Sequence, residues 1–120
     1  MQNRSGVAVD EAGAVELAGR LLHAEGLDGG EVGVLFVAPD EMRRLKKEHL
    51  GLDEETDVLS FPIDRRDALP AGVPRALGDV VLCPQVAGER WRWALAHGLL
   101  HLLGYEHGPE MSTREEALLR

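Results

Sequence analysis

The chain has 120 residues, a formal net charge of −8 at pH 7 and a single cysteine, Cys83. Generic nucleic-acid binders draw their affinity from broad basic surfaces, so this acidic balance argues against that class. The length predicts one domain over residues 1–120. No apolar run approaches the roughly 18 residues of a membrane span, and no internal disulfide is possible, so we expect a cytoplasmic protein without a membrane partner.

The first part of the chain predicts two strands with a helix between them. A short strand over residues 6–10 leads to Asp10, a residue type typical of a helix N-cap. The apolar residues that follow recur with helical periodicity, and Gly26 ends the predicted helix. Residues 31–37, EVGVLFV, form a β-branched run typical of a buried strand.

The middle of the chain predicts one helix and two further strands. Asp40 is expected to cap a helix that ends at Gly51, with acidic residues early and basic ones late, the order that the helix dipole favours. Strands are predicted over residues 56–62, TDVLSFP, and 78–84, GDVVLCP, each ended by a proline. The loop between them, residues 64–77, is long for a compact domain unless it serves a site.

The last part predicts a long helix over residues 85–103 and a short C-terminal helix. The core face of the long helix is formed by residues spaced four, four and three apart, namely Trp91, Leu95, Leu99 and Leu102. In the C-terminal segment, Ser112 is followed three residues later by Glu115, which indicates an N-cap with a capping box.

Three of the five histidines lie in one segment, HGLLHLLGYEH, residues 97–107. His97 and His101 are four residues apart, so on a helix their rings project from one face, close enough to share a metal ion. Gly104 can adopt the positive φ that ends a helix, which lets the chain turn back and bring His107 to the same ion. The spacing therefore predicts a metal site with three protein ligands.

Three neutral imidazoles suit Zn²⁺ better than hard cations, and they leave a fourth tetrahedral position for water. The predicted catalytic group is this zinc-bound water, held by His97, His101 and His107, with a pKa near 7. The alternative is a polar helix end without a metal. It is disfavoured because the spacing arises by chance in roughly one chain in a hundred of this composition.

Gly98 separates this segment from a protease motif. The same histidine spacing occurs in metzincin-type metalloproteases, where a glutamate follows the first histidine as general base. Gly98 occupies that position here, so peptide hydrolysis by that mechanism is disfavoured. The glycine either leaves room for a substrate above the zinc or allows close packing against another backbone, and the sequence leaves both open.

Three segments, TDVLSFP, LGDVVLCP and HGLLHLLGYEH, together resemble the YbeY family of bacterial rRNA maturation factors, described as zinc-dependent endoribonucleases. The resemblance runs nearly end to end. It implies an α+β fold with a small mixed four-stranded sheet, and a zincin-like site for one Zn²⁺ on the last long helix and the following turn. It also implies His97, His101 and His107 as the zinc ligands, with single-stranded rRNA near the 3′ end of 16S rRNA as substrate and the small ribosomal subunit as partner.

The chain departs from the family pattern at two positions. Glu106 stands where members usually carry Asp; two roles are open for it, proton transfer or holding a ligand histidine from outside, and we favour the second. Many relatives have an arginine six residues before Thr56, where this chain has Leu50. Candidate RNA contacts are the basic residues one to two helical turns earlier, Arg43, Lys46 and Lys47.

The predicted function is a single-strand-specific endoribonuclease with a zinc site, acting in rRNA maturation and ribosome quality control. Zinc polarises a phosphoryl oxygen and supplies hydroxide, while a basic side chain stabilises the developing charge. Water and the RNA 2′-hydroxyl both stay open as the nucleophile. The alternative from another class is a ribosome-assembly factor with a structural zinc, which the acidic balance and Leu50 favour; a metallopeptidase is disfavoured by Gly98.

Overall fold

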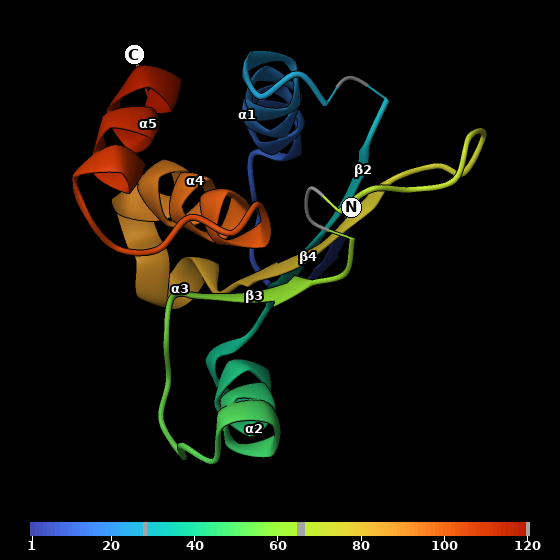
Figure 1. The fold of residues 1–120 in the computed structure, drawn as a ribbon. Coiled ribbons are helices and arrows are strands. Elements are labelled where there is room, and N and C mark those ends of the chain that lie inside the picture. Colours follow the sequence, from blue (N-terminus) through green and yellow to red (C-terminus); the bar gives the residue numbers. More distant parts are fainter. Residues whose placement is uncertain (28, 65–66, 120) are drawn as a thin grey trace.

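The computed structural model of the protein describes residues 1–27, 29–64 and 67–119. A four-stranded sheet runs through its centre in the order β1-β2-β4-β3 (Figure 1). The strands are β1 (Gln2–Arg4), β2 (Glu31–Val37), β3 (Val58–Pro62) and β4 (Ala76–Leu82). β1 and β4 pair with β2 in parallel, and β3 pairs with β4 antiparallel. The predicted α+β fold with a mixed four-stranded sheet is confirmed.

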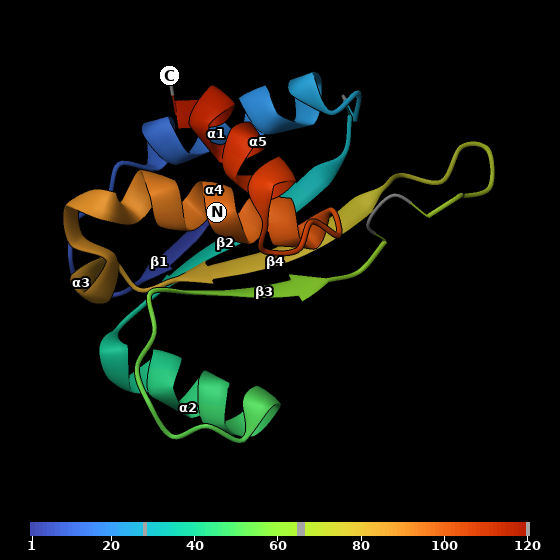
Figure 2. The same cartoon turned by 60° about the vertical axis from the view of Figure 1, so that its left-hand side comes forward.

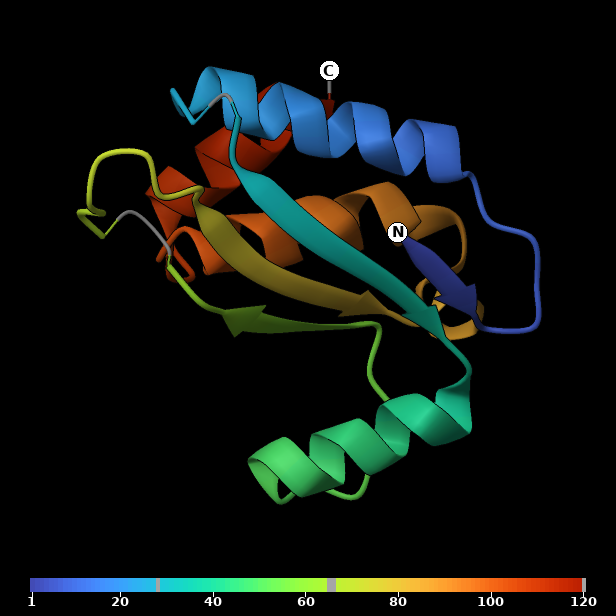
Figure 3. The same cartoon turned by 90° about the vertical axis from the view of Figure 1, so that its right-hand side faces the viewer.

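Three helices lie on one side of the sheet and a fourth lies on the other, as Figures 2 and 3 show. The three are α1 (Glu11–Ala24), α4 (Trp91–Leu102) and α5 (Pro109–Leu119), and the fourth is α2 (Pro39–Leu50). The larger hydrophobic core lies between the sheet and the three helices, and a smaller one surrounds Met42 of α2. No helix in the described part of the chain is both long and apolar enough to cross a membrane.

The first helix begins as predicted and anchors the larger core. Asp10 is its N-cap, and its Oδ1 accepts a hydrogen bond of 2.8 Å from the Gly13 N–H. Ala14, Leu17 and Leu21 recur at helical spacing and are buried against the sheet and its neighbours. Helix α1 therefore forms one side of the helical layer in which α4 lies.

The first strand lies earlier than the sequence predicts. β1 pairs with residues 35–37 of β2, whereas residues 6–10 are not a strand. Local hydrogen bonds end it: Asn3 Oδ1 accepts from the Ser5 N–H at 3.0 Å and from Ser5 Oγ at 2.6 Å. The Val7 N–H donates to Ser5 Oγ at 3.3 Å. Side-chain bonds of this kind compete with sheet pairing.

Helix α2 also begins before its predicted cap. Its N-cap is Ala38, in extended conformation and with no side-chain cap, so the predicted capping role of Asp40 is wrong. Pro39 is its first residue, a position that suits the fixed φ of proline. Gly51 ends the helix with a φ of 71°, as predicted.

The two later strands are displaced by two residues from their predicted starts, β3 beginning at Val58 and β4 at Ala76. Pairing of the chain continues beyond β3, because the Ile63 N–H donates to Leu77 O and the Asp64 N–H to Ala76 O, both at 2.9 Å. The loop is shorter than predicted for this reason. Residues 65 and 66 of that predicted loop lie outside the described residues.

The predicted long helix is broken into three pieces: α3 (Pro84–Ala87), η1 (Gly88–Arg90) and α4. Gly88 ends α3 with a φ of 57°, which favours glycine. The core face of α4 is otherwise as expected, with Leu95, Leu99 and Leu102 fully buried. The last helix starts at Pro109, so the predicted N-cap role of Ser112 and the capping box with Glu115 are wrong.

At Gly98, α4 lies close against the sheet. A Cβ placed on it would lie 2.8 Å from Val58 Cγ2 of β3 and 2.9 Å from Val80 Cγ1 of β4. Ser60 Oγ of β3 donates a hydrogen bond of 2.8 Å to the Gly98 carbonyl. Of the two open interpretations of this glycine, the structure supports close packing, although the neighbouring atoms belong to side chains of the sheet and not to another backbone.

Candidate metal centre

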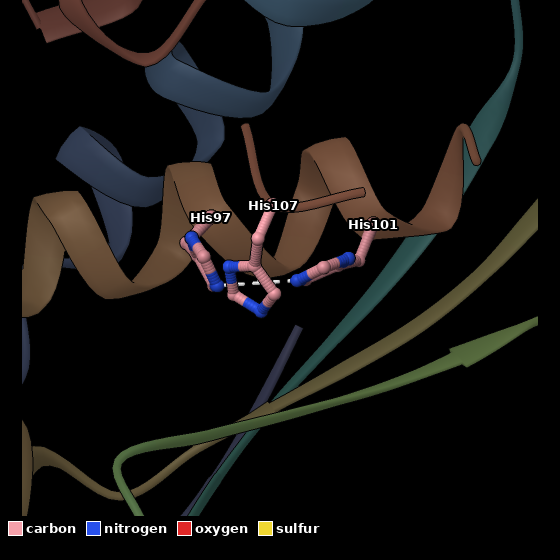
Figure 4. Close-up of side chains that lie close together, drawn as sticks. All are labelled: His97, His101 and His107. Carbon is pink, nitrogen blue, oxygen red and sulfur yellow. Dashed lines mark hydrogen bonds between the residues drawn. The ribbon is translucent and has the colours of Figure 1, made fainter. Parts of the chain in front are cut away.

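His97 and His101 lie one turn apart on α4 and direct their rings toward each other (Figure 4). Their ring centroids are 4.6 Å apart, and their Nε2 atoms are separated by 3.1 Å. Both side chains are half-buried, because the same helix packs its opposite side into the core. The two nitrogens thus meet at the edge of the core, where solvent still reaches them.

The turn after α4 brings in His107. Gly104 has a φ of 94°, and the Tyr105 N–H returns to donate to Leu100 O at 3.2 Å. The exposed His107 ring then lies 4.8 Å from the His97 ring and 4.9 Å from the His101 ring, centroid to centroid (Figure 4). One nitrogen from each of the three histidines lies within 4.8 Å of the other two.

The remaining nitrogens of the two helical histidines are held from outside. His97 Nδ1 lies 2.6 Å from Glu115 Oε1, and His101 Nδ1 lies 2.9 Å from the Tyr105 carbonyl oxygen. With Nδ1 as the donor in each bond, the Nε2 lone pairs are left to converge on one point. This arrangement is common around histidine ligands, since the outer acceptor fixes the tautomer and the orientation of the ring.

Glu115, and not Glu106, contacts a candidate ligand. Glu115 lies on α5 with 11% of its side chain exposed, whereas Glu106 is exposed beside His107 in the turn. The sequence interpretation assigned Glu115 to a capping box and missed this role. The sequence held a signal, because Glu115 shares one helical face with the apolar residues Met111 and Leu118. The structure buries all three.

Three imidazole nitrogens are a donor set of the kind that holds zinc, and the spacing of the two helical histidines matches this metal. Tetrahedral coordination at Zn–N distances of about 2.0–2.1 Å places ligand nitrogens about 3.3 Å apart, close to the 3.1 Å between the Nε2 atoms of His97 and His101. Burial lowers the pKa of His101 below its ordinary value of 6.5, and the neighbouring His97 lowers it further. A neutral imidazole is the form that binds a metal ion. Cys83 is buried elsewhere, beneath α2, and burial raises the pKa of its thiol.

A cleft of about 610 Å³ opens beside the three histidines. Its walls come from α2, β3 with the residues before it, α4 and the turn after α4. Lys46 and Leu50 of α2 reach this cleft, as do Trp93 and Glu106. The Trp93 ring stacks on that of His97 at 4.9 Å between centroids.

The structure separates the three predicted RNA contacts. Lys46 lines the cleft, whereas Arg43 and Lys47 are exposed and lie outside its described lining. Arg43 instead pairs with Asp53, at 3.2 Å between Nε and Oδ1. Only one of the three candidates is therefore placed next to the histidine group.

Comparison with known proteins identifies relatives of the whole chain. The sequence profile of a family described as Endoribonuclease YbeY matches residues 2–119. A protein named Endoribonuclease YbeY from Halorhodospira halophila is 44% identical over 101 residues, which cover 74% of this chain and 66% of the relative. Another of that name, from Beutenbergia cavernae, is 40% identical over 135 aligned residues, covering 96% of this chain and 87% of the relative.

A solved structure shares the fold. The solution structure of TM1509 from Thermotoga maritima superposes with a TM-score of 0.59 at 26% sequence identity, covering 99% of this chain and 87% of the other. The extent of the profile match and the identity to these relatives agree with the histidine geometry. The chain belongs to the YbeY family of endoribonucleases.

Proposed function

We propose that the chain is a zinc-dependent, single-strand-specific endoribonuclease acting in rRNA maturation, at the 3′ end of 16S rRNA, and in ribosome quality control. The observation that carries the metal dependence is the convergence of three histidine nitrogens within 4.8 Å, with two rings oriented from outside. The ribosomal substrate, the small subunit as partner and the cytoplasmic location are supported by the resemblance of the segments TDVLSFP, LGDVVLCP and HGLLHLLGYEH to those of rRNA maturation factors.

The residues of the site have separate tasks in this proposal. His97, His101 and His107 hold one Zn²⁺, which supplies Lewis acidity and lowers the pKa of water to about 7. Glu115 keeps the His97 ring in place through its 2.6 Å contact with Nδ1. The ammonium group of Lys46 offers the positive charge that a phosphodiester needs in the cleft.

The packing of Gly98 argues against a peptidase. A glutamate at this position would have to fit where even a Cβ lies within 3 Å of Val58 and Val80. The general base of the metzincin mechanism therefore has no place directly after the first histidine.

The experiment incubates protein of measured zinc content with an RNA fragment that carries the 3′ end of 16S rRNA, in single-stranded and duplex form. Casein serves as a parallel substrate, and each reaction is run with chelator and with zinc restored. We expect cuts in the single strand only, lost on chelation and regained with zinc. Binding without cleavage by the zinc-loaded protein would favour the assembly factor, and cleavage of casein a peptidase.

A further inference from the structure

Lys46 is the only Lys or Arg among the described residues that line the histidine cleft. Its side chain is 14% exposed, so the ammonium group is held at the wall of the cleft rather than free in solvent. Two carboxylates, Asp57 and Glu106, line the same cleft. Apart from the proposed zinc ion, Lys46 is therefore the side chain of the described cleft wall whose positive charge can attract a polyanionic ligand.

This cation already has a partner. Lys46 Nζ donates a hydrogen bond of 2.8 Å to Glu54 Oε1. Glu54 lies in the segment after α2, which the left-handed turn at Gly51 folds back beside the helix. The pair between Arg43 and Asp53, 3.2 Å, ties the same segment to α2 a turn earlier.

The partner is held weakly enough to be exchanged. The Glu54 side chain is 59% exposed, and an ion pair with one exposed member corresponds to at most about a fivefold change in an equilibrium constant. A carboxylate and a phosphate oxygen compete for the same ammonium hydrogens, and the negative charge of Glu54 also repels a phosphate.

We propose that Lys46 is the phosphate-binding residue of the cleft and that Glu54 is a built-in competitor, which holds Lys46 until a backbone phosphate of single-stranded RNA takes its place. The inference rests on the proposed function, because it names how that site receives its substrate. Competition from Glu54 makes the affinity of the cleft for RNA lower than it would be if Lys46 had no carboxylate partner.

The test compares Glu54→Gln with Glu55→Gln, in the natural chain and in a Lys46→Gln background. Glu55 is the matched control, because it is the adjacent exposed glutamate, loses the same charge and forms no ion pair within the described chain. The ligand is a short fluorescein-labelled 2′-O-methyl oligouridylate, and the readout is fluorescence anisotropy with zinc-loaded, full-length protein at low salt. Zinc content, melting temperature and the integrity of the RNA are measured for every variant.

We expect Glu54→Gln to bind about two- to fivefold more tightly than the natural chain, and Glu55→Gln to change the Kd by clearly less. Lys46→Gln should weaken binding, and in that background Glu54→Gln should gain no more than Glu55→Gln. Equal effects of the two glutamine variants in the natural chain, or a gain at Glu54 that persists without Lys46, would overturn the inference.

The outcome also separates this inference from the proposed function. A natural chain that cuts RNA with zinc, but shows no special effect of Glu54, removes the competitor and leaves the enzyme. A folded, zinc-loaded chain that neither binds nor cuts RNA removes both.

Discussion

Glu115 shows how one side chain connects a helix to the histidine group. It is buried on α5, 18 residues from His97 in sequence, and its Oε1 lies 2.6 Å from His97 Nδ1. A carboxylate in this position fixes the ring and increases the basicity of the nitrogen that faces the metal. The contact therefore links the packing of α5 to the affinity for zinc.

We expect Glu115→Gln to lower zinc affinity by about 10- to 100-fold, because the amide keeps the shape but loses the charge. Competition with a chromophoric chelator measures the affinity, and circular dichroism confirms the fold. Glu116→Gln is the matched control, since Glu116 is exposed on the same helix. Equal zinc affinities for the two variants would remove Glu115 from the site.

Gly98 provides a second prediction at the scale of one residue. Gly98→Ala places a methyl group within 3 Å of Val58 and Val80, and overpacking of this kind costs about 1–3 kcal/mol. The better helix propensity of alanine offsets about 1 kcal/mol of this cost, so we expect a net loss of up to about 2 kcal/mol in the free energy of unfolding. Urea denaturation measures it.

The control for this prediction is Gly19→Ala on α1, where nothing lies within 4 Å of the new Cβ. There the better helix propensity acts alone, and the variant should gain up to about 1 kcal/mol. If both alanine variants are equally stable, α4 does not approach the sheet as closely as the structure indicates.

The histidine ligand set is the part of the site that the sequence predicts directly. His97 and His101 are related by the helical period, and Gly104 marks where the chain can turn. Glu115 and Lys46 were harder to place, because they reach the site from α5 and α2. Which helices meet at a cleft depends on packing across the sheet, and spacing within one segment does not contain that information.

At the scale of elements, continuous apolar runs were predicted more accurately than the points where elements begin. The apolar run at residues 31–37 forms strand β2 with the predicted bounds. The starts of α2 and α5 were misplaced because Pro39 and Pro109 begin these helices ahead of the expected cap residues, Asp40 and Ser112. The break at Gly88 was missed because the apolar periodicity continues past it on α4.

The turn after α4 supplies a prediction about its own function. His107 is exposed there, so its side chain contributes little packing. We expect His107→Ala to release most of the zinc while changing the stability of the metal-free protein by no more than about 0.5 kcal/mol. Metal analysis after dialysis and urea denaturation measure the two effects.

His49→Ala is the control for this prediction, because His49 packs against Phe61 outside the histidine group. It should retain its zinc. Full zinc retention by His107→Ala would instead show that the turn does not deliver a ligand.

At the scale of the whole molecule, the half-buried histidine group makes the stability of the metal-free protein depend on pH. The pKa of His101 is lowered in the fold, chiefly by burial, so the unfolded chain binds its proton more readily. Stability rises with pH wherever the unfolded state holds more protons. The loss of stability caused by His101 is therefore absent well above pH 6.5, the ordinary pKa of histidine, and grows as the pH falls through that value.

We accordingly expect the free energy of unfolding of the metal-free protein to fall between about pH 7 and about pH 5. Urea denaturation at each pH measures the fall, and His101→Gln should reduce it. Two results would contradict the assignment of this pH dependence to His101. One is a metal-free natural chain whose stability is constant over this range, and the other is a His101→Gln variant that loses as much stability as the natural chain.

The net charge of −8 bears on how the molecule as a whole binds RNA. Each phosphate neutralised on a single strand contributes about −0.7 to the slope of log K against log salt. With Lys46 in the cleft and only Arg43 and Lys47 as further candidates on α2, we expect a slope between about −0.7 and about −2. Lys46→Gln should make the slope shallower by about 0.7, and Glu55→Gln should leave it unchanged. Anisotropy titrations of the oligouridylate over a series of salt concentrations measure these slopes. A slope near −5 would require a broad basic surface that three cations cannot provide, and would place the RNA elsewhere on the protein.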